Sequence, residues 1–538
     1  MRVERPVRQL GNWATTALMV MVVLLWGATF RAGVEKNLVG TLNAQEWGRY
    51  LFAFGATLTQ SRFGIGGYVI DGPIEQKLQS EGLTDNPEVL KRLGSKFPDN
   101  LHDSRIMQNA LERANDFDVA APPPGDYQRL RGSVGDDVGI ATFTSFAFRL
   151  FGLKVSSLYY TYFSLLGVAI FFFLLGHYRS PGALTCLALM MLAIYLLVIS
   201  NLMNQTIVTI SIKDPRFFGT IAAIAALHLL LVWNREDYPL RIVDYVAVAG
   251  QALMFAFALH IRWPSSWLVL SLCGSWIMLC LWQIRGILRK RGKLNRCQRI
   301  RYFLFGAIFF LIIGAGVIAT NMTAHPLYRI DGDVLRHPFW HHMIGSLEAN
   351  PEWWTKYFPT VNGVSGDSMP AEIAKQEIAK LPPDQRPQYL MRIGYPSPQA
   401  IAFFARKRFF QILRADPWFV IRTFAIENPK VMIAQIPGFY GGFAQVVTPA
   451  QLAGPILSLV LLLWVVATKR EALLVLTSIT PIAVILAVIA LAPLIIATAH
   501  PLIMVDHFLW SLFSLGLIAC VGTAYVINFF SFARQSLP

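Results

Sequence analysis

The sequence predicts an all-α polytopic membrane protein with about ten transmembrane helices and two helical segments on the outer face of the membrane. Hydrophobic residues make up 54% of the 538 residues, and only 15% are charged. Several stretches of roughly 18 or more residues carry no charge, which is the length needed to cross the hydrocarbon core of a bilayer. The predicted spans cover residues 13–30, 158–176, 182–200, 217–233, 242–260, 265–284, 302–320, 452–467, 472–498 and 506–527.

The first of these stretches, Trp13 to Phe30, follows a basic N-terminal segment and so has some features of a signal peptide. It is long for the apolar region of a signal peptide, and the residues from Trp26 to Arg31 make a poor cleavage site. We therefore expect a retained transmembrane helix.

Basic residues indicate how the spans are oriented. Short loops rich in Lys and Arg stay on the cytoplasmic side of a membrane, and the connection at 285–301 is basic without any acidic residue. We expect this cluster to stop translocation and to contact anionic lipids rather than nucleic acid. The pattern predicts cytoplasmic termini, and the net charge of +15 is partly a consequence of this topology.

The spans divide the chain into five parts. Residues 1–30 form the cytoplasmic N-terminus and first span, 31–157 the first outer segment, and 158–320 a bundle of six spans. Residues 321–451 form the second outer segment, and 452–538 the last three spans and a cytoplasmic tail. All five cysteines fall in spans or in the inner basic loop, so the outer segments depend on packing rather than disulfides. This composition fits a bacterial inner (plasma) membrane.

Two adjacent carboxylates, Asp136 and Asp137, precede a short amphipathic stretch from Ile140 to Leu153. Ionised carboxylates beside a bilayer cost free energy unless they are solvated, paired or functional. The N-terminus of a helix favours negative charge, so one interpretation is that the pair caps a juxtamembrane helix. The other interpretation is that the two acids carry chemistry.

Two further outer connections hold side chains that suit a phosphorylated or sugar ligand. The connection at 201–216 contains Lys213 and Arg216, and the next outer connection contains His260, Arg262 and Trp263. A guanidinium binds a lipid phosphate through two hydrogen bonds, and an indole covers a sugar face. The alternative is that these residues anchor the span ends in the headgroup region.

In the second outer segment, the helix starts are predicted at Ser397-Pro398 and Asp416-Pro417, where a polar cap precedes proline. The first of these helices alternates basic and aromatic residues, which predicts a helix resting on lipid headgroups. An aromatic group is interpreted as a sugar-stacking platform or as a membrane-interface belt; it comprises Trp353, Trp354, Tyr357 and Phe358.

His337 and His341 in the same segment have the four-residue spacing of metal ligands on one helix face. No glutamate stands where a zinc protease would need one, and Pro338 permits the helix only if it lies in the first turn. The acid pair could ligate a divalent metal, although it has no further recognisable ligands, so a divalent metal stays an open alternative and no other cofactor is assigned.

The order of one span, a long outer segment with an acidic motif, many spans and a second outer segment resembles the GT-C superfamily of membrane glycosyltransferases. The acidic stretch Gly135-Asp136-Asp137-Val138-Gly139-Ile140, followed by Phe148-Arg149-Leu150-Phe151-Gly152, is similar to stretches found in many members. Residues 415–422, beginning Ala415-Asp416-Pro417, resemble an amphipathic stretch in their later outer regions.

This resemblance implies a membrane glycosyltransferase of the cell envelope, moving a hexosyl or pentosyl group from a polyprenyl-phosphate donor to an outer-face lipid, glycan or protein. It implies that Asp137 or Asp136 is the general base and that Arg262 and Arg216 hold the phosphate, with Lys213, His260 and Trp263 as further substrate-binding residues. Many members place the essential acid shortly after the first span, which makes Glu46 an alternative base.

Two other functions stay open: a lipid or solute transporter or flippase, and a non-enzymatic subunit of a polymer-export complex. Transporters carry ionisable residues within their spans and show repeated halves. The spans are nearly free of such residues apart from His228, Asp244, Asp506 and His507, and the two halves show no repeat. The sequence therefore favours an enzyme that works with membrane lipid and leaves its oligomeric state open.

Overall fold

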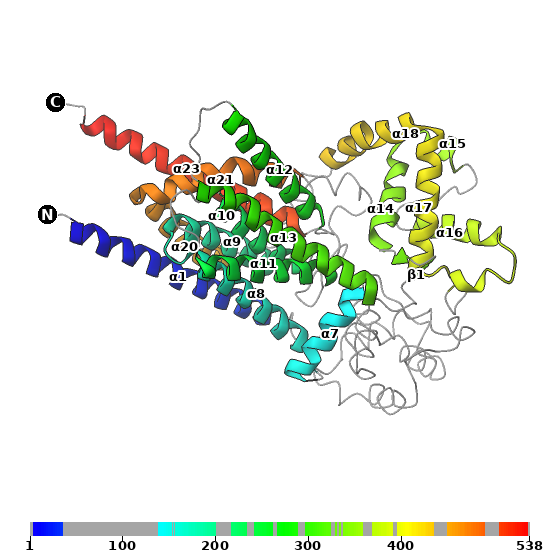
Figure 1. Ribbon diagram of the computed structural model, residues 1–538, viewed down its shortest axis with the longest axis horizontal. Coiled ribbons are helices and arrows are strands. Elements are labelled where there is room, and N and C mark those ends of the chain that lie inside the picture. Colours follow the sequence, from blue (N-terminus) through cyan, green and yellow to red (C-terminus); the bar gives the residue numbers. More distant parts are fainter. Residues whose placement is uncertain are drawn as a thin grey trace.

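The computed structural model describes the chain as a bundle of long apolar helices and a smaller helical unit beyond one end of that bundle (Figure 1). Helix α1 begins and helix α23 ends at the end of the bundle far from this unit. The described residues are 4–35, 138–152, 154, 156–200, 217–233, 241–261, 266–288, 296–323, 329–330, 333–334, 337–358, 368–390, 395–434, 449–489 and 505–535.

Eight of the described helices are long and apolar enough to cross a membrane, so the chain is a multi-pass membrane protein. They are α1 (Glu4–Glu35), α8 (Ser156–His177), α9 (Pro181–Ser200), α11 (Ile242–Ile261), α13 (Arg296–Thr323), α20 (Pro449–Thr468), α21 (Arg470–Ile489) and α23 (Val505–Gln535).

The other two predicted spans fall on α10 (Phe218–Trp233) and α12 (Ser266–Leu288), whose apolar stretches are shorter. Helix α10 has 16 residues. At 1.5 Å per residue it is about 24 Å long, less than the roughly 30 Å of a hydrocarbon core. All ten predicted spans thus overlap helices, although residues 490–498 of the ninth lie outside the described residues.

Helix α10 lies at the centre of the bundle, and every one of its residues is buried. A helix that is hydrophobic on all sides has no face that favours water, so its neighbours must cover it completely. Helices α8, α9, α11 and α23 pack against it. Helix α9 is also largely buried, because α1, α20, α21 and α23 pack around it.

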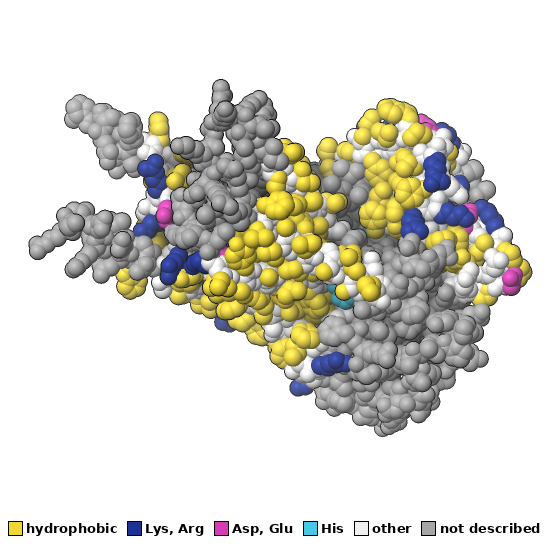
Figure 2. Space-filling view, in the orientation of Figure 1, with side chains coloured by type: hydrophobic (Ala, Val, Ile, Leu, Met, Phe, Trp, Pro, Cys, Tyr) yellow, Lys and Arg dark blue, Asp and Glu magenta, His cyan; other side chains and the backbone are white. Residues whose placement is uncertain are grey.

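Apolar side chains cover much of the described bundle surface on the face seen in Figure 2. Leu270, Leu311 and Leu457 belong to three different helices and are each more than 70% exposed. An apolar surface of this extent is the kind that membrane lipid covers.

Hydrogen bonds between polar side chains and neighbouring helices link the interior of the bundle. The hydroxyl groups of Tyr162 and Thr220 are 2.6 Å apart, and Gln251 donates to the Ala169 carbonyl at 2.7 Å. Interhelical hydrogen bonds in membrane proteins average about 0.6 kcal/mol, so they select the packing of the helices more than they drive it.

Helix α7 (Val138–Phe151) packs across the bundle at the end nearest the smaller unit, against α8 and α11. Phe143 and Ala147 are fully buried there, whereas Leu150 and Phe151 are exposed. The predicted amphipathic helix is therefore present, and protein covers the first half of its apolar face.

Gly152 ends α7 with a φ of +85°, in the left-handed region. Its amide donates to the Phe148 carbonyl at 2.9 Å, and its own carbonyl accepts from the Ser157 hydroxyl at 2.7 Å. The chain thereby turns from α7 into α8 within five residues, a helix ending that glycine permits at little cost.

Replacing this glycine should destabilise the turn. We expect Gly152→Ala to lower the free energy of unfolding by about 1–2 kcal/mol, because an L-residue pays that cost in the left-handed region. Thermal unfolding of the purified protein in detergent measures the effect. The matched control is Gly274→Ala in α12, where an added Cβ meets nothing within 4 Å. Equal melting temperatures for the two variants would contradict the account.

The smaller unit, here called the distal unit, comprises residues 337–358, 368–390 and 395–434. A two-residue antiparallel ladder, β1 (Arg329–Ile330) with β2 (Asp333–Val334), precedes it and is a minor departure from the all-α prediction. The helical elements of the distal unit are α14 (His337–Gly345), η7 (Ser346–Ala349), α15 (Trp353–Lys356), α16 (Ser368–Ala379), η8 (Pro387–Tyr389), α17 (Pro398–Ala415), α18 (Pro417–Arg422) and the π-helical η9 (Thr423–Glu427).

Both predicted helix starts in the distal unit are confirmed. The Ser397 side chain caps α17 by accepting from the Ala400 amide at 3.1 Å. The Asp416 carboxylate caps α18 by accepting from the Phe419 amide at 3.0 Å. In each case proline occupies the first helical position, where its missing amide proton leaves no hydrogen bond unmade.

The aromatic group of this segment is neither a sugar platform nor an interface belt. Trp353 is fully buried and Phe358 is 4% exposed, and their rings stack with centroids 5.7 Å apart. Trp354 and Tyr357 pack against the same cluster of buried side chains. These residues form the core of the distal unit, because α14, α16, α17 and α18 fold around them.

The prediction that α17 rests on lipid headgroups is also wrong for most of its apolar face. Phe404, Phe409 and Ile412 are buried, and α17 packs against α14 and α16. Phe410 remains 40% exposed. The amphipathic pattern correctly identified a face that must be covered, but other helices of the unit cover it.

Asp416 makes the distal unit sensitive to acid. The Lys356 ammonium, with further help from the Phe419 amide, holds the pKa of Asp416 below its ordinary value. A group whose folded pKa is depressed stabilises the fold fully above its unfolded pKa of about 3.9, and this contribution is lost as the pH falls through the folded pKa. We expect Asp416→Asn to remove this part of the acid response.

Hydrogen–deuterium exchange of the full-length protein between pH 3 and pH 7, corrected for intrinsic rates, checks this expectation over residues 353–422. The control is Asp384→Asn, which removes an exposed carboxylate that forms no ion pair with any described residue. An Asp416→Asn protein that loses protection in acid as steeply as the wild type would rule out this role.

Candidate functional site

Of the eight residues predicted to form the site, the structure describes His260. It lies in the last turn of α11, at the end of the bundle nearest the distal unit. The other seven lie outside the described residues: Glu46, Asp136, Asp137, Lys213, Arg216, Arg262 and Trp263.

His260 joins three helices through its two ring nitrogens. Its Nε2 is 2.9 Å from the Thr142 hydroxyl of α7, and its Nδ1 is 2.8 Å from the Thr320 hydroxyl of α13. The Thr320 hydroxyl donates its single proton to the Gly316 carbonyl at 2.9 Å, so it accepts from Nδ1.

The first turn of α7 lies directly against the end of α11. A Cβ at Gly139 would collide with the backbone of His260 and Ile261, which explains why this position of the acidic motif suits glycine. Thr142, one turn further along α7, is buried and meets the His260 ring. A close backbone approach and a polar link thus fix the contact between α7 and α11.

Helix α7 also contacts the start of α10. The rings of Phe143 and Phe218 meet edge to face with centroids 4.7 Å apart, and Phe257 of α11 lies 6.4 Å from Phe218. Edge-to-face pairs add about 0.5–1.5 kcal/mol beyond the area they bury.

Residues that border three predicted motifs therefore meet around α7. Gly139 follows the acid pair by two residues, Ile261 immediately precedes Arg262, and Phe218 follows Arg216 by two. Gly139 contacts Ile261, and Phe143 contacts Phe218. These two contacts bring together the chain positions next to the acid pair, Arg262 and Arg216, and we call this place the α7 junction. Thr142 and Thr320 were missed by sequence reasoning, since a threonine near the end of an apolar helix carries no signal of its own.

A second polar group lies inside the bundle, toward the end where the chain termini lie. The rings of His177 and His228 are 4.8 Å apart, and both side chains are buried. Nearby, Arg241 pairs with Asp244 at 2.9 Å and also donates to the Gly176 carbonyl at 3.5 Å. His228 and Asp244 were identified from the sequence as ionisable residues of the spans, whereas His177 was missed because it is the last residue of α8.

Within the described ranges, no three His, Cys, Asp or Glu side chains are grouped so that they could hold a metal ion. His337 opens α14 with Pro338 in its first turn, as the metal-ligand spacing required. His341 is buried, and its ring packs against that of His342 with centroids 5.4 Å apart. The acid pair lies outside these ranges, so its capacity to ligate a metal stays a prediction.

No protein-family model, curated protein or solved structure matches this chain.

The contact at Gly139 can be tested by adding one methyl group. We expect Gly139→Ala to lower the free energy of unfolding by about 1–3 kcal/mol, the usual cost of overpacking, because the Cβ would displace α7 from α11. Thermal unfolding in detergent measures the change. Gly314→Ala in α13 is the control, since an added Cβ there meets nothing within 4 Å. If both substitutions leave the melting temperature unchanged, α7 does not pack on α11 in this way.

Proposed function

We propose that this chain is a GT-C-like membrane glycosyltransferase that moves a sugar from a polyprenyl-phosphate donor to an acceptor on the outer face of the membrane. The observation that carries the proposal is the junction around α7, where residues bordering the acid pair, Arg216 and Arg262 meet. Such convergence is what the reaction needs, because a base and phosphate-binding cations must reach one substrate.

The proposed chemistry assigns each predicted residue a role. Asp137 or Asp136 accepts the proton of the acceptor hydroxyl, which attacks the sugar as its bond to the carrier phosphate breaks. Arg262 and Arg216, with Lys213, stabilise the charge that develops on the departing phosphate. Trp263 covers a face of the sugar. Glu46, which lies nearer the first span in the sequence, is the alternative base.

His260 has a positioning role in this proposal rather than the substrate contact expected from the sequence. Both of its ring nitrogens lie within hydrogen-bond distance of threonine hydroxyls, one on α7 and one on α13. A ring held in this way fixes the start of α7 relative to α11 and α13. The acid pair immediately before α7 and Arg262 immediately after α11 would then keep a constant position relative to each other.

The proposed orientation puts both chain termini in the cytoplasm of a bacterial cell and the α7 junction on the outer side of the inner membrane. The end of the bundle where the termini lie carries Arg179, Arg241, Lys469 and Arg470 at the ends of described helices. Figure 2 shows dark-blue Lys and Arg side chains gathered at this end. Their position supports the orientation, since cytoplasmic loops are enriched in Lys and Arg.

Transport of a lipid or solute is the second candidate, and one observation favours it. His177, His228 and Asp244 are buried in the bundle, and buried ionisable groups of membrane proteins often line the path of a proton or substrate. Asp244, however, is paired with Arg241, which is itself partly exposed at the start of α11. This local pairing argues against Asp244 as part of a transport path. A non-enzymatic role in polymer export has no specific observation in its favour.

Sugar transfer in isolated membranes tests the proposal. Membranes containing the protein are supplied with radiolabelled polyprenyl-phosphate sugars, and the labelled product is counted. We expect Asp137→Asn or Asp136→Asn to reduce transfer by about 10²–10⁴-fold, the usual contribution of a general base. Loss of activity only in Glu46→Gln would move the base to the alternative position.

Asp384→Asn serves as the control, because it removes an exposed carboxylate of the distal unit and should leave transfer unchanged. Protein amounts are matched by immunoblotting. A wild-type protein that transfers sugar from no lipid-linked donor would reject the proposal, and transport assays would then take priority. Normal transfer by all three acid variants would reject these acids as the base.

A further inference from the structure

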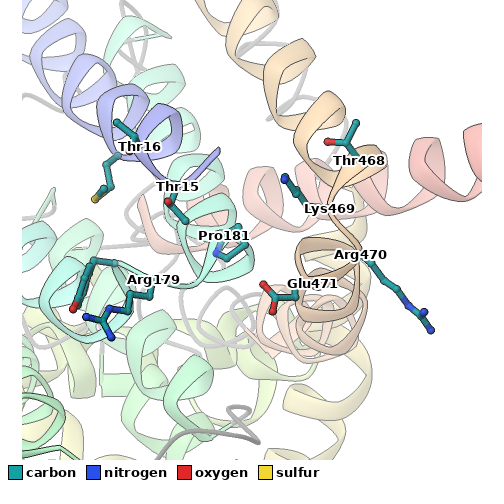
Figure 3. A pocket seen from close by; sticks show the side chains of 10 residues that line it. Thr15, Thr16, Arg179, Pro181, Thr468, Lys469, Arg470 and Glu471 are labelled. Atoms are coloured by element: carbon teal, nitrogen blue, oxygen red, sulfur yellow. The ribbon is translucent and has the colours of Figure 1, made fainter. Parts of the chain in front are cut away.

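A cavity of about 810 Å³ opens at the end of the bundle where the termini lie, far from the α7 junction (Figure 3). Three parts of the chain line it: α1, the turn between α8 and α9, and the junction of α20 with α21. Its polar lining includes Thr15, Thr16, Arg179, Thr468, Lys469, Arg470 and Glu471.

Helix packing holds these three parts together. Helix α9 contacts α1, α20 and α21, and a Cβ at Gly182 would lie only 2.6 Å from the side chain of Val475 in α21. The first turn of α9 therefore lies tightly against α21. The two turns that bear Arg179 and Lys469 are each short, since α9 begins four residues after α8 ends and α21 begins two residues after α20 ends. The cavity is thus bordered by fixed elements.

The charged groups of the cavity carry both signs. In Figure 3, Glu471 points toward the space between Arg179 and Lys469, whereas Arg470 points away from it. Among the described residues, Arg179, Lys469 and Glu471 form no ion pair with one another or with other side chains. Arg179 stacks over the Tyr178 ring at 5.0 Å. Arg179, Lys469 and Glu471 thus border one cavity without forming ion pairs with one another.

We propose that this cavity binds the headgroup of an amine-bearing phospholipid. The phosphate would lie between Arg179 and Lys469, since guanidinium and ammonium groups form strong charge-assisted hydrogen bonds with phosphate oxygens. The headgroup ammonium would lie beside Glu471. A headgroup that carries only negative charge lacks a partner for this carboxylate and is repelled by it. Binding of a headgroup in this cavity is independent of the proposed sugar transfer.

The surroundings of the cavity favour a lipid over a soluble phosphate ester. Met19 lines the cavity, and Val20 and Val23 of α1 continue from it with exposed apolar side chains. On the other side, Trp464 is 57% exposed one turn before Thr468. These surfaces offer acyl chains an apolar path beside a headgroup held at the end of the spans. The depth of the cavity in the membrane also fits a lipid headgroup, because Arg and Lys at span ends lie at the level of the headgroups.

Thermal unfolding of the purified full-length protein in detergent, with added lipid, tests the assignment. Phosphatidylethanolamine should raise the melting temperature at lower concentration than phosphatidylglycerol does. Arg179→Gln and Lys469→Gln should each weaken the apparent affinity for phosphatidylethanolamine by about tenfold, as expected for the loss of one charge-assisted contact. Glu471→Gln should abolish the preference for phosphatidylethanolamine over phosphatidylglycerol.

Arg470→Gln is the matched control, because Arg470 borders the cavity from the same turn but its guanidinium points away from Glu471 and Lys469 (Figure 3). Its response to lipid should equal that of the wild type. Each variant is first checked for a monodisperse peak and a cooperative transition without added lipid. The comparison of lipids with the wild-type protein needs no variant and stands if one of them fails to fold.

Three results would overturn the proposal. Equal melting-temperature shifts of the wild type with the two lipids would show that Glu471 does not recognise the headgroup ammonium. Stabilisation by soluble glycerophosphoethanolamine or inorganic phosphate at the same concentration would identify a site for a free phosphate rather than for a lipid. Absence of any shift with phosphatidylethanolamine, together with its absence from the protein in native mass spectrometry, would show that the cavity does not bind this headgroup.

Discussion

Helix α10 imposes the constraint on which the rest of the bundle depends, because all of its residues are buried. It is apolar on every side, so α8, α9, α11 and α23 must enclose it. This arrangement also determines the end of the bundle nearest the distal unit. The ring of Phe218, the first residue of α10, packs against that of Phe143 in α7. Helix α7 in turn contacts His260 at the end of α11. The position of the candidate site thus follows from the enclosure of one short helix.

The sequence predicted local features well and the partners of those features less well. Spans follow from long apolar stretches, and the starts of α17 and α18 follow from a polar residue before proline, since these signals lie within a few residues of each other. The apolar face of α17 and the aromatic group around Trp353 were assigned to lipid or sugar, but the distal unit buries them. Amphipathic patterns show that a face is covered without showing whether lipid or protein covers it.

The candidate site shows the same limit at the level of single residues. His260 stood out because it neighbours Arg262 and Trp263 at the end of a predicted span. Its partners Thr142 and Thr320 are 118 and 60 residues away in the chain, and no local pattern connects them. Only the packing of α7, α11 and α13 brings these hydroxyls to the imidazole. The sequence could therefore suggest which residues matter but not which of them lie together.

The arrangement of α9 has a consequence for how the protein is made. Its neighbours α20, α21 and α23 come from the last part of the chain, so the face of α9 that they cover is synthesised long before they are. About 250 residues separate the end of α9 from the start of α20, which corresponds to roughly 10–50 s of translation at 5–20 residues per second. During this interval lipid or the insertion machinery must occupy that face of α9. Completion of the bundle is then a late step of biogenesis, in which the C-terminal helices displace a temporary partner.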